Sequence, residues 1–405
     1  MKRTLLILLA FITLTASLQS CKPSKKADPV PTVLVGGLFS ITGNWNTLGK
    51  ASTAALLIAE ADVNTYLDQK NAPFRIAVAY ADTKLSADTA VLAFNSAVNG
   101  NVKFLIGPQS SAELAAVMPL VGTKALVISQ SSTAGTLAIE GDNVFRFCPP
   151  DNVEGAAVAN SIYNSGITAL ATVARNDAGN KGLQTATGNT FTQLGGHVTA
   201  LEPYATSTLN FTSVVASLKS NIETLENTYG EGKVGVYLAS FDECVALFNA
   251  ANNEPVLKNV KWFGGDGVAL SAALLANATA ADFAIATHFF APSFGLPAEL
   301  ESRWKPIATR IKTMSGIDAD AFALSVYDAV WTLTRAIEAN NSNAADIAAI
   351  KAKFIEQAST TPGITGNLSL DAAGDRENGV FDYWSLKKDG TTYKWYVVSR
   401  SNVPI

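Results

Sequence analysis

Histidine, cysteine and methionine are rare, with two, three and three copies in 405 residues. Neither His197 nor His288 has a Cys, His or carboxylate neighbour at metal-ligand spacing, so we predict no metal site. The sequence contains no Gly-x-Ser-x-Gly or Gly-x-x-x-x-Gly-Lys motif. No histidine base is evident for a nucleophile such as Ser111. We therefore expect no catalytic residues and no cofactor.

Positive charge is also scarce, since 30 basic residues face 34 acidic ones and the net charge is −4. No long basic stripe occurs, which argues against nucleic-acid binding. Hydrophobic residues make up 48% of the chain and charged residues 16%, enough apolar material for a large core. The length of 405 residues fits two domains.

The N-terminus has the pattern of an export signal. Lys2 and Arg3 precede a short apolar run, and Leu18-Gln-Ser-Cys21 resembles a bacterial lipobox. We expect a signal peptide over 1–20, lipid attachment to Cys21, a polar tether over 21–31 and a location outside the cytoplasm on a bacterial membrane. An ordinary signal peptide with an incidental cysteine is the alternative. The sequence does not indicate which leaflet of the membrane holds the lipid anchor.

Cys148 and Cys244 remain outside this leader. An exported protein could join them in a disulfide. Both lie in apolar surroundings, where an unpaired cysteine packs as a small hydrophobic residue. We favour unpaired cysteines and leave pairing open.

Strand and helix patterns alternate twice along the chain. Apolar strands are predicted near 32–38, 75–82, 102–107 and 124–130, and again near 169–177, 197–204, 233–240 and 260–267, with helices between them. The last third adds helices over 301–316, 319–340 and 344–358 and strands within 366–398. We predict an α/β protein with two doubly wound parallel-sheet lobes joined by a hinge of several crossovers. Lobe one would comprise 32–147 plus 290–361, and lobe two 148–289 plus 362–405.

Polar loops follow several predicted strands, at the sheet edge where ligands bind in this class of fold. Ser110, Ser111, Ser131 and Thr133 offer hydroxyls, either for helix capping or for an anion such as a carboxylate. Asp266 follows a strand of the second unit and either caps a helix near Ala269 or pairs with a cation such as an ammonium group. Together the loops predict recognition of an amino acid or similar zwitterion.

Seven stretches carry a family resemblance over about residues 32–400. They are GGLFSITGNWNTLGKASTAALLIAEADVN, LIGPQSSAELAAVMPLV, LVISQSSTAGTL, VFRFCPPDNVEGAAVA, NFTSVVASLK, WFGGDGV and GNLSLDAAGDREN. In this order the chain resembles type I periplasmic binding proteins of the branched-chain amino acid transport group. The resemblance implies a clamshell protein that delivers its ligand to an ABC-type permease, and we expect it to be a monomer. The alternative is a sensor lobe that reports an amino acid or amide to a membrane partner.

The resemblance also implies site residues. Ser111 would receive the ligand carboxylate, the carbonyl of Ser131 and the side chain of Asp266 would bind its ammonium, and Thr133 would contact both ends. From its place at the predicted helix start, we expect Ser110 to receive the carboxylate as well. Trp45 and Leu48 would lie beside the ligand side chain, with Phe241 closing over it. Gly179 stands where family members often have a tyrosine, with Asn176 and Arg175 nearby. We expect Asn176 to contact ligand, and Arg175 either to reach an acidic ligand or to lie solvated at the rim.

Overall fold

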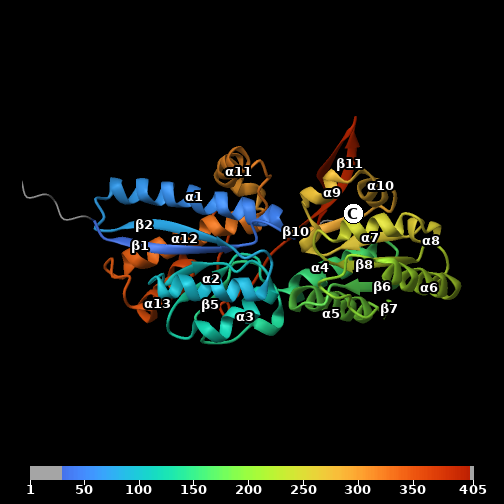
Figure 1. The fold of residues 1–405 in the computed structure, drawn as a ribbon, viewed down its shortest axis with the longest axis horizontal. Coiled ribbons are helices and arrows are strands. Elements are labelled where there is room, and N and C mark those ends of the chain that lie inside the picture. Colours follow the sequence, from blue (N-terminus) through green and yellow to red (C-terminus); the bar gives the residue numbers. More distant parts are fainter. Residues whose placement is uncertain (1–29, 402–405) are drawn as a thin grey trace, which may run out of the picture.

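The computed structural model describes residues 30–401, which form two α/β lobes side by side (Figure 1). The predicted signal peptide, Cys21 and nearly all of the tether lie outside these residues. Within 30–401, none of the helices combines the length and the apolar character that crossing a membrane requires.

The first lobe contains a five-stranded parallel sheet in the order β2-β1-β3-β4-β5. The strands are β1 (Thr32–Phe39), β2 (Arg75–Asp82), β3 (Phe104–Ile106), β4 (Leu126–Ser129) and β5 (Val144–Arg146). The helices of this lobe are α1 (Asn46–Gln69), α2 (Ala87–Asn99), α3 (Ser111–Val121), α11 (Glu301–Ser315), α12 (Ala321–Ala339) and α13 (Ile347–Thr360). Most residues of β3 and β4 are fully buried, as expected for a parallel sheet covered on both faces.

The second lobe contains a seven-stranded sheet in the order β12-β11-β10-β9-β8-β6-β7. The strands are β6 (Ala169–Ala174), β7 (His197–Ala200), β8 (Val234–Ala239), β9 (Lys261–Gly264), β10 (Phe290–Phe294), β11 (Phe381–Asp389) and β12 (Thr392–Arg400). The helices are α4 (Asp151–Asn164), α5 (Ala178–Gln193), α6 (Thr212–Tyr229), α7 (Cys244–Ala251), α8 (Pro255–Lys258), α9 (Ala272–Ala276) and α10 (Ala278–Ala286). The sheet is parallel except for the β11–β12 hairpin, which is antiparallel to β10.

The chain crosses between the lobes three times, after β5, after β10 and before β11. Phe290–Phe294 forms β10 and pairs with β9 and β11 in the second sheet, so lobe one does not resume at residue 290 as predicted. The sequence does not predict this strand because it contains Pro292, and proline is disfavoured inside sheets. The sequence predicts strands within 366–398, but residues 366–378 form only isolated bridges, so that first part of the prediction is wrong.

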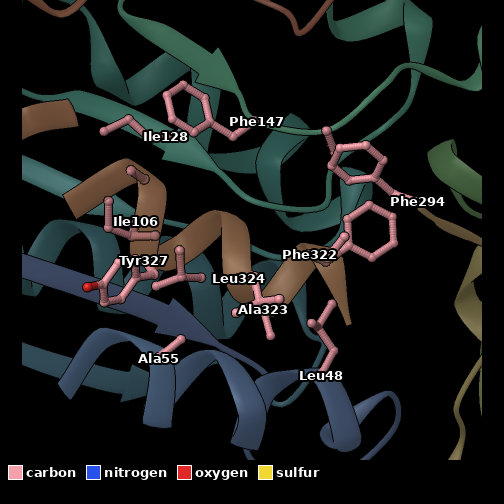
Figure 2. Close-up of a cluster of buried hydrophobic side chains, with 14 of the residues drawn as sticks. Leu48, Ala55, Ile106, Ile128, Phe147, Phe294, Phe322, Ala323, Leu324 and Tyr327 are labelled. Atoms are coloured by element: carbon pink, nitrogen blue, oxygen red, sulfur yellow. The ribbon is translucent and has the colours of Figure 1, made fainter. Parts of the chain in front are cut away.

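Helix α12 lies in the middle of the first lobe's core. Figure 2 shows its Phe322 and Leu324 among Leu48 of α1 and Ile106 of β3. Nearly every residue from Ala321 to Ile337 is buried, because α1 covers one side of the helix and the sheet another.

Buried polar contacts hold the crossing segments together. The Arg146 guanidinium at the end of β5 forms an ion pair with Asp375, and both side chains are almost fully buried. The Asp328 carboxylate of α12 accepts hydrogen bonds from the backbone N–H groups of Ile364 (2.7 Å) and Thr365 (2.9 Å). A buried ion pair that loses one partner destabilises a protein strongly, so these contacts fix how the segments pass one another.

Cys148 and Cys244 are both buried and unpaired, which confirms the favoured prediction. Burial raises the pKa of each thiol well above its usual value.

Candidate functional site

A narrow cavity lies between the lobes, and its empty space of about 280 Å³ includes a part that is open to solvent. Its walls are Trp45, Ser110, Ser111, Ser131, Thr133, Asp177, Gly179, Asn180, Leu183, Phe241 and Asp266. Seven of the nine predicted ligand-binding residues are therefore brought to one place. Each comes from a loop at the carboxyl end of a strand, where the following helix begins.

Ser110 caps helix α3. Its hydroxyl accepts the N–H of Glu113 (3.3 Å), and the Glu113 carboxylate accepts the N–H of Ser110 (3.1 Å). This reciprocal capping box satisfies two N–H groups that the helix itself leaves free. The capping alternative therefore holds for Ser110, whereas Ser111 is the first helical residue and does not cap.

The Ser111 hydroxyl joins the two hydroxyl-rich loops of the first lobe. It accepts the backbone N–H groups of Thr133 (3.2 Å) and Ala134 (3.1 Å). In return, the Ser131 hydroxyl donates to the carbonyl of Gln109 at 2.7 Å. These bonds fix both loops at one edge of the sheet, so their small polar groups converge on the cavity.

Asp266 forms the opposite wall, and it does not cap a helix. The short turn Asp266–Val268 has Gly265 at its N-cap without a side-chain bond, and α9 begins only at Ala272 with Ser271 as its cap. The backbone N–H of Asp266 donates to the carboxyl of Glu154 in α4 (3.1 Å). The Asp266 side chain is thus left to face the cavity, with 6% of the residue exposed.

Burial and neighbouring acids change how these carboxyl groups ionise. Burial raises the pKa of Asp266 to about 8, and the charge of Asp151 contributes to the increase. Burial likewise raises the pKa of Asp151 to about 7, although the positive charge of Arg146 opposes the increase. The second-lobe side of the cavity is therefore rich in carboxyl groups that a cation would stabilise in the ionised form.

Trp45 of the first lobe stacks on Phe241 of the second, with 4.6 Å between ring centroids and 29° between ring planes. Hydrogen bonds support this contact. The N–H of Trp45 donates to Asp242 (2.8 Å), the N–H of Asp242 donates to the Asn44 side chain (2.9 Å), and Asn44 donates to Glu243 (2.5 Å). The lobes thus touch directly across the mouth of the cavity.

A family model described as the receptor family ligand-binding region matches residues 51–389. The chain belongs to this family. Its fold is that of the type I periplasmic binding proteins, which typically bind solutes without catalysing reactions.

Two relatives span almost the whole chain. An uncharacterized protein of Methanocaldococcus jannaschii is 25% identical over 377 residues, covering 88% of each chain. The leucine-, isoleucine-, valine-, threonine- and alanine-binding protein of Pseudomonas aeruginosa is 24% identical over 377 residues, covering 91% of this chain and 92% of its own.

Solved structures are similar in fold at lower identity. The branched-chain amino acid transporter substrate-binding protein of Streptococcus pneumoniae, in complex with isoleucine, has a TM-score of 0.72 at 18% identity and covers 91% of this chain and 99% of its own. A solute-binding protein of an ABC transporter from R. palustris, in complex with benzoate, has a TM-score of 0.71 at 17% identity. The match covers 91% of this chain and 96% of the R. palustris chain.

Two of the predicted ligand-binding residues, Leu48 and Asn176, do not line the cavity between the lobes. Leu48 points into the first lobe's core beside α12 (Figure 2). Asn176 is exposed, and its backbone N–H donates to the carbonyl of Tyr204 (2.8 Å). The next residue, Asp177, lines the cavity instead and caps α5 by accepting the N–H of Asn180 (2.9 Å).

Arg175 is 8% exposed, so the prediction of a solvated rim charge is wrong. Two carboxylates draw the guanidinium inwards, Asp177 at 2.9 Å and Glu243 at 3.4 Å.

Gly179 lines the cavity where the resemblance suggested a tyrosine. A methyl group there would lie 3.2 Å from the Ser111 hydroxyl, so the glycine allows α5 to approach α3.

Proposed function

We propose that this protein is a lipid-anchored, extracytoplasmic solute-binding protein that captures a small amino acid or similar zwitterion for an ABC-type permease. One observation carries the proposal: the cavity has hydroxyl-rich loops on one wall and the Asp266 carboxyl on the other. A carboxylate on the first wall and an ammonium group on the second would use both. Charge-assisted hydrogen bonds contribute about 1.5–3 kcal/mol each, so a few give micromolar affinity.

The surplus of carboxyl groups favours an ammonium-bearing ligand over an aromatic acid such as the benzoate of the R. palustris protein. A ligand with only a carboxylate would add negative charge beside Asp266, Asp177 and the buried Asp151. An amino acid brings a positive charge of its own to that wall. The narrow cavity and the Trp45–Phe241 contact favour a small side chain.

Attachment to the membrane is part of the proposal and depends on Cys21. A short flexible tether from a lipidated Cys21 would hold the lobes near the permease. Mass spectrometry of membrane-extracted protein should find a diacylglyceryl group on an N-terminal Cys21. An N-terminus elsewhere, without lipid, would contradict this part only.

A thermal-shift screen tests the ligand class directly. Protein starting at Lys22 would be tested against the common amino acids, small amides, short peptides and benzoate. A ligand that binds only the folded state stabilises it by about 2.7 kcal/mol at one hundred times its Kd. Shifts with a few related amino acids support the proposal. No shift with any amino acid, in protein that has been unfolded and refolded to remove retained ligand, or a shift with benzoate alone, contradicts it.

A further inference from the structure

Three carboxyl groups gather behind the second-lobe wall of the cavity. Glu154 accepts the backbone N–H of Asp266 at 3.1 Å, and Asp151, one turn earlier in α4, donates its own backbone N–H to the carbonyl of Thr133 at 2.8 Å. Asp266 and Thr133 both line the cavity. We call Asp151, Glu154 and Asp266 the carboxyl triad.

Three of the six carboxyl oxygens of the triad are buried without a hydrogen-bond partner among the described residues. Within residues 30–401, neither oxygen of Asp151 has one, nor does Oε2 of Glu154. Asp151 is 3% exposed and Glu154 is fully buried. An ionised carboxylate in such a place loses its hydration without compensation, which strongly disfavours ionisation. The triad is therefore built to hold protons unless a cation lies beside it.

The described surroundings of the triad supply little positive charge. The ionisable groups that face it are Arg146 and Cys148 at the first crossing, Asp177 at the start of α5, Tyr237 of β8, Asp320 at the start of α12 and Tyr383 of β11. Arg146 alone is cationic among these, and it already forms an ion pair with Asp375. Arg175, which follows β6, is engaged by Asp177 and Glu243.

We propose that the carboxyl triad stores protons and releases one when the cationic group of a ligand binds Asp266, so that ligand affinity rises with pH. This inference rests on the proposed function, because it requires an ammonium-bearing ligand in the cavity. Burial raises the pKa of all three acids, and neighbouring carboxyl groups add to it: Asp266 and Asp151 at Glu154, Asp151 at Asp266, and Asp177 at Asp151.

The proton and charge balance is simple. In the ligand-free protein the Asp266 carboxyl carries its proton. When an ammonium group arrives, the O–H bond breaks, the proton leaves to solvent, and the carboxylate pairs with the ammonium. The site at Asp266 is neutral in both states, first as a protonated carboxyl and then as a carboxylate paired with the ammonium. Burial and the charge of Asp151 keep Asp266 protonated beforehand, and Glu154 holds the Asp266 backbone, so Asp151 and Glu154 act on the ligand through Asp266.

Isothermal titration calorimetry at pH 7, in phosphate and in Tris, tests the release. The heats differ between these buffers in proportion to the protons released. The probes are L-leucine, L-alanine and L-threonine. We expect release approaching one proton and a Kd that falls by up to about tenfold per pH unit between pH 6 and 7. Equal heats in both buffers would overturn the proposal.

Variants separate the triad from other acids. Asp151→Asn should reduce the protons released and flatten the pH dependence, because Asp266 then ionises more easily. Asp389→Asn is the control, because Asp389 is exposed at the end of β11 and forms an ion pair with Lys394. An unchanged proton count in Asp151→Asn would overturn the proposal.

If no amino acid of the thermal-shift screen binds, the proposed function is contradicted, and the ligand-free protein still decides whether the triad stores protons. Infrared spectra at pH 7 should show a protonated-carboxyl C=O band that weakens in Glu154→Gln. A band unaffected by this substitution, or no such band, overturns proton storage even if an amino acid binds.

Discussion

Trp45 and Phe241 lie on different lobes, and their rings stack with centroids 4.6 Å apart. The two residues are 196 positions apart in sequence (241 − 45), so the contact exists only when the lobes are together. It lies at the cavity, beside Asp266 and Ser111. The same two rings therefore close the cleft and bound the space left for a ligand.

Trp45→Ala should loosen the closed arrangement. An aromatic pair contributes about 0.5–1.5 kcal/mol beyond its burial, so the open–closed equilibrium should shift by about two- to tenfold towards open. Energy transfer between dyes on the two lobes measures this shift. Trp331→Ala is the control, since Trp331 packs on Tyr66 within the first lobe. An equal loss of closure in both variants would show that the Trp45–Phe241 contact has no special role.

Asp266→Asn should weaken amino acid binding by about ten- to one-hundredfold. The substitution keeps the shape of the side chain but removes a charge-assisted hydrogen bond worth about 1.5–3 kcal/mol. Calorimetry with the best amino acid from the screen measures the Kd. Asp389→Asn removes an exposed carboxylate and should leave the Kd unchanged. Parent-like binding by Asp266→Asn would remove this residue from the site.

The same variant should change how stability depends on pH. An aspartate ionises near pH 3.9 in an unfolded chain, whereas the pKa of Asp266 is raised to about 8 in the folded protein. Between these values the folded state holds a proton that the unfolded state has lost, so the free energy of unfolding falls as pH rises. Melting curves of ligand-free protein should show Asp266→Asn gaining stability relative to the parent from pH 5 to pH 8. A constant difference would mean that Asp266 ionises normally.

Gly182→Ala should destabilise the protein by about 1–3 kcal/mol. Gly182 lies inside α5, and a methyl group there would come within 2.0 Å of the Asp151 carboxyl. Gly188→Ala in the same helix is the matched control, because its methyl group would meet Val198 at an ordinary 3.5 Å. Alanine is the better helix former, so this control should be neutral or slightly stabilising. Urea unfolding compares the two, and equal stabilities would contradict the close packing of α4 on α5.

Thiol labelling should confirm that Cys148 and Cys244 are shielded. Both are buried, and burial raises the pKa of each thiol, so little reactive thiolate forms. Protein starting at Lys22, kept without reductant, should show no reactive thiol when folded and two when unfolded in urea. A disulfide found by mass spectrometry would contradict the unpaired arrangement.

Much of the fold could be predicted because parallel strands covered on both faces leave long apolar runs, as in β4 and β8. The strand β10 could not, since Pro292 breaks that pattern and a hairpin from the end of the chain completes its pairing. Leu48 belongs to the apolar face of α1, and its inward direction depends on α12, far away in sequence.

The hydroxyl loops and Asp266 could be chosen from the sequence because each directly follows a strand. Asp151 and Glu154 could not, since nothing local distinguishes them from helix-starting acids. Their importance comes from Asp266, 112 residues after Glu154. The contacts of Asp242 and Glu243 with Asn44 were missed for the same reason, as they form only across the two lobes. Ligand contacts of the chosen residues stay predictions.

Three crossing segments and the buried Arg146–Asp375 pair have a mechanical consequence for the clamshell. A single flexible linker would let one lobe turn about the other in any direction. Three parallel connections, with two of them joined by a buried ion pair, resist twisting and sliding and leave bending as the soft direction. One angle then describes the state of the whole molecule. A membrane partner that contacts both lobes could read occupancy of the cleft from that angle alone, without touching the ligand.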